Sequence, residues 1–172
     1  MATLAAIERE PMTRLATWVA IASMTCGPAL AFEVDSFRSG MSFAEAKSLV
    51  EKQAYERVEL KDNQIRAWDT RSVASGIFLD FCKGRLVSVQ KNLQPRFDYF
   101  TRLVDEKRSA LGRPLDAWSR PTDVTSSVES NAIALIWRDG SDFVSVTYTE
   151  FSSNKQLYIT HDARNDCWRI PY

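Results

Sequence analysis

The sequence predicts an α+β fold of two helix-then-antiparallel-strands units, with the helices packed on one face of an antiparallel sheet. Two stretches, residues 42–54 and 95–114, carry apolar residues at helical spacing. Each is followed by segments in which apolar and polar residues alternate, as in half-buried strands. Helices separated by runs of hairpins favour this architecture. We place the two units at about residues 37–93 and 94–172.

The first 31 residues have the pattern of a cleaved signal peptide. Leu15 to Met24 is mostly apolar, a Gly-Pro pair then breaks the helix, and Ala29 and Ala31 fit the small residues before a cleavage site. Residues 1–11 carry acidic side chains where a signal is basic, so we expect translation to start at Met12. The alternative, a buried N-terminal helix, leaves the Gly-Pro pair and the alanines without a purpose.

Cys26 offers a second alternative, a lipoprotein anchored to a membrane through an acylated cysteine. The three residues before Cys26 fit that pattern poorly. With cleavage after Ala31, we expect a periplasmic or secreted protein that forms a single α+β domain over residues 32–172. We expect no transmembrane segment in that mature chain.

The charge balance of the mature chain is neutral. The full chain has 22 basic and 22 acidic residues. The signal contains two of each, so its removal leaves 20 basic and 20 acidic side chains. No long run of like charge is present, and we therefore expect no nucleic acid among the partners.

Cleavage leaves two of the three cysteines, Cys82 and Cys167. An even number in an exported chain indicates one disulfide between them. Two separate buried thiols are the alternative, which an oxidising compartment disfavours. The chain has no Cys-x-x-Cys pair, so we do not expect a redox enzyme.

The first unit begins with a helix at residues 42–54. Ser42 and Glu45 have the spacing of a capping box, in which each side chain accepts a hydrogen bond from the backbone of the other. Two short strands around Asp62-Asn63 are expected next, within residues 57–69, and then a clear hairpin over residues 76–93.

The register of that hairpin depends on its turn. A two-residue turn at Lys83-Gly84 would pair Leu79 with Ser88 and mix the two faces. A three-residue loop, with Gly84 in a left-handed conformation, pairs Leu79 with Val87 instead, and we predict that register. It gathers five apolar side chains on one face: Ile77, Leu79, Phe81, Val87 and Val89.

The second unit begins with the helix at residues 95–114, which Gly112 should end. We expect a loop at residues 116–129, which are rich in Ser, Thr and Pro. Trp137 alternates with apolar neighbours and is expected in the core. Strands are predicted at residues 131–138, 142–150 and 156–161.

Three short motifs resemble the BamE-like (SmpA/OmlA) proteins of the bacterial envelope and, more broadly, the β-lactamase-inhibitor-like repeat fold. They are Gly40-Met41-Ser42 at a helix start, Leu111-Gly112-Arg113-Pro114 at a helix end, and Lys83-Gly84-Arg85-Leu86 between strands. As architecture the resemblance covers most of residues 37–160. The first helix lacks the Leu-Gly-x-Pro exit, and the lipid-bearing cysteine of the family has no good counterpart. Members of the family bind other proteins and are not enzymes, so the resemblance implies a binding or assembly role.

No motif for catalysis, metal binding or a cofactor is found. His161 is the only histidine, and no nucleophile motif accompanies it, so we expect no catalytic triad and a surface or hydrogen-bonded structural role for it. One histidine and two cysteines assigned to a disulfide do not make a zinc site. No phosphate-binding loop, dinucleotide fingerprint or EF-hand loop is present.

Carboxylates leave one enzymatic alternative open, an exported hydrolase with a carboxylate-based site. Asp139 and Asp142 are close in sequence, but turns favour acidic residues for backbone reasons. Asp162, Asn165 and Asp166 have oxygen ligands for a weak calcium site, although loop solvation explains them equally.

Three residues are candidates for protein binding. Trp118 and Arg120 lie in the expected loop and Trp168 near the carboxyl terminus, and exposed Trp and Arg are enriched at binding hot spots. Alternatively, each tryptophan covers an edge of the core. We expect a non-catalytic envelope domain that binds another protein, in an assembly or inhibitor-type role. The alternatives are the carboxylate hydrolase and a subunit acylated at Cys26.

Overall fold

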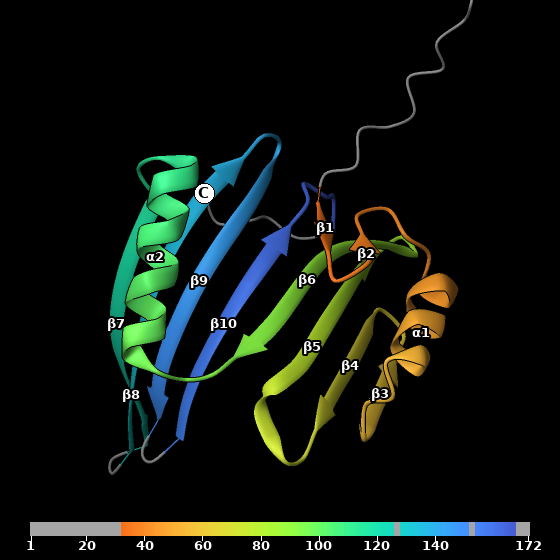
Figure 1. Ribbon diagram of the computed structural model, residues 1–172, viewed down its shortest axis with the longest axis horizontal. Helices are drawn as coiled ribbons and strands as arrows, with labels where there is room; N and C mark the ends of the chain where they lie inside the picture. Colours follow the sequence, from red (N-terminus) through yellow and green to blue (C-terminus); the bar gives the residue numbers. More distant parts are fainter. Residues whose placement is uncertain (1–31, 126–127, 152–153, 168–172) are drawn as a thin grey trace, which may run out of the picture.

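The computed structural model describes residues 32–125, 128–151 and 154–167. Two short strands come first, and each of two helices then precedes four longer strands (Figure 1). In chain order the elements are β1 (Glu33–Val34), β2 (Phe37–Arg38), α1 (Phe43–Lys52), β3 (Arg57–Lys61), β4 (Gln64–Asp69), β5 (Ser72–Cys82), β6 (Arg85–Leu93), α2 (Phe97–Leu111), β7 (Asp116–Thr125), β8 (Val128–Asp139), β9 (Asp142–Phe151) and β10 (Asn154–Asp162).

The predicted fold class is wrong, because the protein is mostly β. Strand accounts for 55% of the structure and helix for 20%. Eight strands form one antiparallel sheet in the order β3-β4-β5-β6-β10-β9-β8-β7, and the described residues contain only two helices. Several strands are longer than the segments in which apolar and polar residues alternate, because backbone pairing continues wherever a neighbouring strand is present. The molecule is thus a mostly β protein built on one continuous eight-stranded sheet with two helices on it, and not the α+β fold of two helix-and-strand units that the sequence predicts.

Strands β6 and β10 join the two halves of the sheet. They are far apart in sequence but pair over six positions, from Ser88 with Asp162 to Leu93 with Leu157. Every other neighbouring pair in the large sheet is a hairpin between consecutive strands. This single long-range pairing therefore decides which side chains of the two halves lie next to each other.

Helix α1 begins at the predicted capping box. The Ser42 hydroxyl accepts a hydrogen bond from the Glu45 N–H (3.3 Å), and the Glu45 carboxylate accepts one from the Ser42 N–H (2.8 Å). Ala46 and Val50 are fully buried against the first half of the sheet. The largest fully buried side chains of that cluster are Phe37, Ile65, Ile77, Leu79, Phe81 and Leu86.

Helix α2 ends at Gly112, as predicted, with a positive φ of 81°. Phe100 and Leu103 pack into the second cluster, which also holds Val144, Val146, Leu157 and Ile159. The prediction that Trp137 lies in the core is confirmed, since it is fully buried. Its indole N–H donates to the Gly112 carbonyl (3.1 Å), so the same tryptophan ties the helix end to the sheet.

The predicted register of the β5–β6 hairpin is wrong. Lys83 and Gly84 form a two-residue turn with positive φ at both positions, and Phe81 pairs with Leu86. A bulge then places the extra residue Val87 on β6, which shifts the register so that Leu79 pairs with Val89. The bulge keeps the apolar side chains on one face, which a turn alone could not do.

The segment predicted as a loop, residues 116–129, is mostly strand. Strand β7 runs along the edge of the sheet and pairs with β8 from Asp116–Ile136 to Thr125–Val128. Pro121 is compatible with this position because an edge strand has one side free of backbone partners. Pairing with β8, which lies later in the chain, imposes the strand on a sequence of low apolar content.

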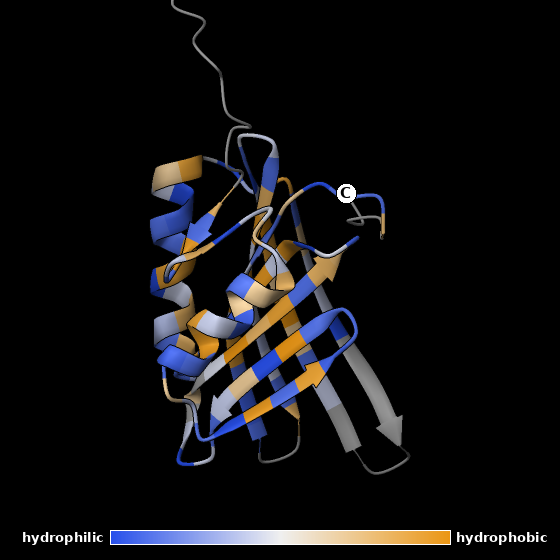
Figure 2. Cartoon of the chain, turned by 90° about the vertical axis from the view of Figure 1, so that its right-hand side faces the viewer, coloured by the Kyte–Doolittle hydropathy of each residue, from blue (hydrophilic) through white to orange (hydrophobic). Residues whose placement is uncertain are grey.

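The two faces of the sheet differ in what covers them. Register places the side chains under both helices in common cross-strand rows, such as Leu79, Val89, His161, Val144 and Trp137, and we call this side the helix face. In the side view of Figure 2 both helices lie to the left of the sheet. The opposite side, which neither helix covers, we call the open face. Neither helix in the described part of the chain has the length and apolar character to span a membrane.

Candidate functional site

The open face carries a central band of hydroxyl and amide side chains. Register aligns Gln90, Thr160 and Ser145 in one cross-strand row, and Asn92, Tyr158 and Thr147 in the next. These groups both donate and accept hydrogen bonds. They lie across strands β6, β10 and β9, in the middle of the sheet.

Arginine–aromatic pairs flank this band on both sides. Each guanidinium carbon lies between 5.1 and 5.8 Å from a ring centroid: Arg57 over Trp68, Arg66 over Phe78, Arg120 over Trp118 and Arg138 over Phe143. All eight side chains belong to the open face by register. Stacking holds the long arginine side chains against rigid rings, so they lose less conformational freedom when a ligand binds.

Two of the three residues singled out from the sequence lie in this site. Trp118 is half-buried and Arg120 exposed, and both are on edge strand β7 rather than in the loop that the sequence suggested. Trp168 lies outside the described residues. So do Ala29 and Ala31 of the expected cleavage site, Cys26, and the expected start at Met12.

Two carboxylates of the open face have raised pKa values. Asp80 and Asp162 lie on either side of Ser88 in one cross-strand row. Burial raises the pKa of Asp162, and the charge of Asp80 raises it further. A hydrogen bond from Ser88 acts in the opposite direction and lowers this pKa. Burial also raises the pKa of Asp80, which the Gln64 amide and the Arg66 charge partly oppose. Neither carboxylate lines the pocket described next.

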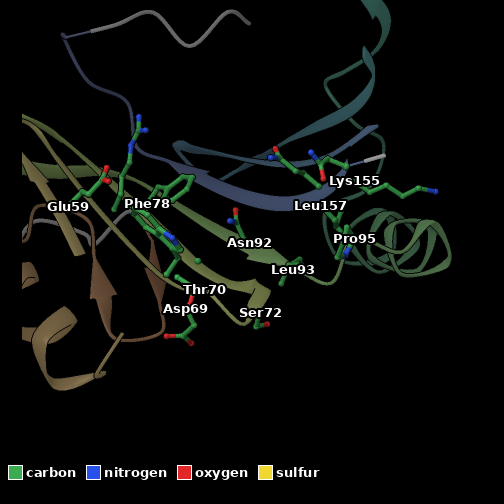
Figure 3. A pocket seen from close by; sticks show the side chains of 15 residues that line it. Glu59, Asp69, Thr70, Ser72, Phe78, Asn92, Leu93, Pro95, Lys155 and Leu157 are labelled. Atoms are coloured by element: carbon green, nitrogen blue, oxygen red, sulfur yellow. The ribbon is translucent and has the colours of Figure 1, made fainter. Parts of the chain in front are cut away.

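A pocket of about 510 Å³ opens on the open face at one end of the sheet (Figure 3). One wall comes from strands β3 to β5 and includes Glu59, Arg66, Trp68 and Phe78. The other comes from the end of β6 and the start of β10. It contributes Asn92, Leu93, Asn154, Gln156 and Leu157. A second, smaller hollow shares Asn154 and Gln156 and continues toward Thr149 and Ser130.

His161 lies on the other side of the sheet, between Val89 and Val144 on the neighbouring strands. It is half-buried, and its ring lies 6.3 Å from that of Phe32. Burial lowers its pKa to about 4, helped by the charge of Lys107 and opposed by that of Asp139. The imidazole is therefore neutral near pH 7. Within the described residues it makes no hydrogen bond, and its ring is more enclosed than the surface role expected from the sequence implies.

Asp139 and Asp142 flank the β8–β9 turn, as expected. Asp142 is only 3% exposed; one of its oxygens accepts a hydrogen bond from the Ser141 hydroxyl (3.0 Å). The other oxygen has no partner among the described residues. Burial raises the pKa of Asp142, and the neighbouring charge of Asp139 adds to this effect.

The structure does not assemble the suggested calcium ligands. Asp166 is bound to Lys83 (2.7 Å), and the Asn165 side chain bonds to the backbone of Ala163 and Cys167. Asp162 belongs to the open face. In the described segments no group of three or more His, Cys, Asp or Glu side chains is placed to hold a metal ion.

Cys82 and Cys167 are brought together, as the sequence predicts. Their sulfur atoms are 2.10 Å apart and their Cα atoms 5.7 Å, a disulfide that closes 85 residues. The bond links the end of β5 to the segment after β10, beside the ion pair between Lys83 and Asp166.

Sequence reasoning missed the aromatic residues of the first half of the sheet. Trp68 and Phe78 received no role, although a usable signal existed. In β4, Ile65 and Ala67 occupy the buried phase of the alternation, so Arg66 and Trp68 must lie on the other face. A large aromatic residue in the outward phase of a strand is a sign of a binding surface.

Comparison of the chain with protein families, characterised proteins and solved structures finds no match. The resemblance to BamE-like proteins therefore stays a prediction, and the interpretation of function rests on the chemistry of the open face.

Proposed function

We propose that this protein is an exported, non-catalytic envelope domain that binds another protein through the open face of its sheet. The observation that carries the proposal is the set of four arginine–aromatic pairs on that face. Tryptophan and arginine are the residues most enriched at interface hot spots. The hydroxyl and amide groups between them supply the hydrogen bonds that an interface of ordinary polarity needs.

The charges of this face favour a partner with exposed carboxylates. Of the four stacked arginines, only Arg57 has a carboxylate within ion-pair distance among the described residues, that of Glu59 at 3.1 Å. Within the described residues Arg66, Arg120 and Arg138 have no ion pair, so their guanidinium groups can make paired hydrogen bonds with carboxylates of a partner.

The hydrolase alternative has less support. It needs two carboxylates facing one pocket. Two carboxylates, Glu59 and Asp69, do line the pocket, but Glu59 is paired with Arg57 (3.1 Å) and Asp69 accepts a hydrogen bond from the Glu56 N–H (3.1 Å). The two open-face carboxylates with raised pKa values, Asp80 and Asp162, lie outside the lining. Asp139 and Asp142 belong to the helix face and also lie outside the pocket lining.

The test is capture of the partner from the envelope extract of the source cells with the tagged protein, compared between variants. Trp118→Ala and Arg120→Ala should each lose the retained protein by about tenfold or more, as expected for hot-spot residues. The matched control is Arg102→Ala, because Arg102 also stacks on an aromatic ring, Tyr99 at 5.5 Å, but does so on helix α2. Equal retention by all three variants would contradict the proposal, as would no retention above background.

A further inference from the structure

The pocket forms where β5 and β6 separate at one end of the sheet. Their pairing ends at Ile77 with Lys91, yet β5 begins at Ser72 and β6 continues to Leu93. Beyond that point β6 pairs only with β10. The gap between the two strands becomes the pocket of about 510 Å³, a size in the usual range for small-molecule sites.

The two aromatic rings in the pocket are held in fixed orientations. Trp68 and Phe78 are both half-buried, and each packs against an arginine, Arg57 at 5.1 Å and Arg66 at 5.5 Å. Aromatic faces carry partial negative charge and attract positively polarised groups. The C–H bonds on the flat side of a sugar ring are such groups.

The hydrogen-bonding groups of the pocket are mostly neutral. Asn92, Asn154 and Gln156 present amides, while Thr70 and Ser72 present hydroxyls. The three amides can both donate and accept, as sugar hydroxyls do. The Thr70 hydroxyl already donates to Glu56 (2.5 Å) and the Ser72 hydroxyl already accepts from the Ala74 N–H (3.3 Å), so the amides carry the argument. The Gln90 amide donates to the Asn92 oxygen (3.3 Å) and so leaves the Asn92 N–H groups for a ligand.

The charges of the pocket cancel and argue against an anionic ligand. Glu59 and Asp69 face Arg66 and Lys155 in the lining. Glu59 is paired with Arg57 and Lys155 with Glu150, at 3.1 and 3.0 Å. Only Arg66 has no carboxylate at ion-pair distance among the described residues; it donates to the Gln64 oxygen (3.2 Å). A guanidinium has enough N–H groups to reach two neighbouring hydroxyls as well.

Gly76 places the Asn92 amide against the backbone of β5. A Cβ atom added at Gly76 would lie 2.6 Å from the Asn92 Nδ2 atom, so no other residue allows the amide its position. A glycine inside a strand often marks such a close approach. Because Asn92 has a flexible side chain, a larger residue at Gly76 would displace the amide without breaking the sheet.

From these features we propose that the pocket binds a neutral saccharide. Trp68 and Phe78 stack on the sugar, while Asn92, Gln156 and Arg66 bind its hydroxyls. The pocket overlaps one part of the proposed protein-binding face, because the Arg57–Trp68 and Arg66–Phe78 pairs contribute to both. Trp118 and Arg120 lie on β7, the edge strand farthest from β3, and belong to the protein-binding role alone.

The test is a titration of the isotope-labelled protein, followed by NMR at the Trp68 indole and the Asn92 side-chain amide. The probes are maltose, cellobiose, lactose and N,N′-diacetylchitobiose, with glucuronate and inorganic phosphate as anionic comparisons. We expect a saturable shift confined to the pocket for at least one neutral disaccharide, with a Kd on the order of 1 mM or below.

Three variants sharpen the result. Gly76→Ala and Gln156→Leu should each weaken binding by about three- to tenfold, the loss expected for one hydrogen-bonding group. Trp118→Ala should leave the saccharide Kd unchanged, although it should abolish partner capture. The spectra away from the pocket serve as the check that each variant is folded.

No shift with any of the four disaccharides would overturn the inference. So would a response to glucuronate or phosphate alone, which would make this an anion site. Retained binding in both pocket variants would overturn it too. None of these outcomes depends on whether a protein partner is found.

Discussion

His161 is the residue whose chemistry depends most on the packing around it. It lies in the helix-face row between the two apolar clusters, and burial lowers its pKa from 6.5 to about 4. The protein thus holds a neutral imidazole where Lys107 discourages protonation and Asp139 favours it. The sequence could not show that this histidine is largely enclosed, because its row partners come from β6 and β9.

We therefore expect His161 to make stability depend on acid pH. Between its folded pKa of about 4 and its unfolded pKa of 6.5, the unfolded chain binds more protons. Stability is then complete above the unfolded pKa and falls as the pH drops toward 4, by about 2–3 kcal/mol in total. Urea unfolding at a series of pH values should reveal this slope.

His161→Gln is the control for that experiment. The raised pKa values of Asp80, Asp142 and Asp162 act in the opposite direction, since those groups bind protons more readily in the folded state. They are shared by the wild type and the variant, so the difference between the two curves isolates His161. Parallel curves between pH 4 and 6.5 would refute this assignment.

At the scale of elements, local signals predicted the helices well. The capping box at Ser42 and the stop at Gly112 lie where the sequence placed them. The strands were predicted less well. Strand β7 was predicted as a loop, and the β5–β6 register was predicted wrongly because the bulge at Val87 was not foreseen. A helix makes its hydrogen bonds with residues four positions away, whereas a strand depends on a partner that no short window contains.

The capping box provides a prediction at this scale. Ser42→Ala should destabilise the protein by about 1 kcal/mol, because the Glu45 N–H loses its hydroxyl acceptor and the Glu45 carboxylate loses the bond from that hydroxyl. Ser42→Asp should recover most of the loss. Ser48→Ala, at an exposed position within α1, is the matched control, and it should be neutral or slightly stabilising. Equal effects at residues 42 and 48, measured by urea unfolding, would argue against the cap.

At the scale of the whole molecule, one pairing and one covalent bond unite the two halves. Strands β6 and β10 make the sheet continuous, and the disulfide from Cys82 to Cys167 ties the segment after β10 back to the first half. The Ala163 N–H also donates to the Val87 carbonyl (2.8 Å), so the bulge in β6 receives a partner from this same segment.

The disulfide should contribute substantially to stability. In the chain-entropy model a closed loop of 85 residues stabilises the folded state by about 4–5 kcal/mol. Reductant should lower the urea midpoint of the wild type accordingly. The Cys82→Ser/Cys167→Ser double variant should start at the lower midpoint and should not respond to reductant. If thiol reagents label both cysteines in the unfolded, unreduced protein, the bond is absent and this prediction fails.

The sequence by itself determined the two helices, most hairpin positions, the buried Trp137 and the cysteine pair. Spacing and capping depend on near neighbours, and the two cysteines left after the expected signal cleavage allow only one pairing. Only the tertiary structure decided the mostly β class, the strand at residues 116–125 and the gathering of Trp68, Phe78 and Trp118 on one face. The physical reason is that the β6–β10 pairing joins residues about 70 positions apart, and the composition of the open face follows from that long-range register.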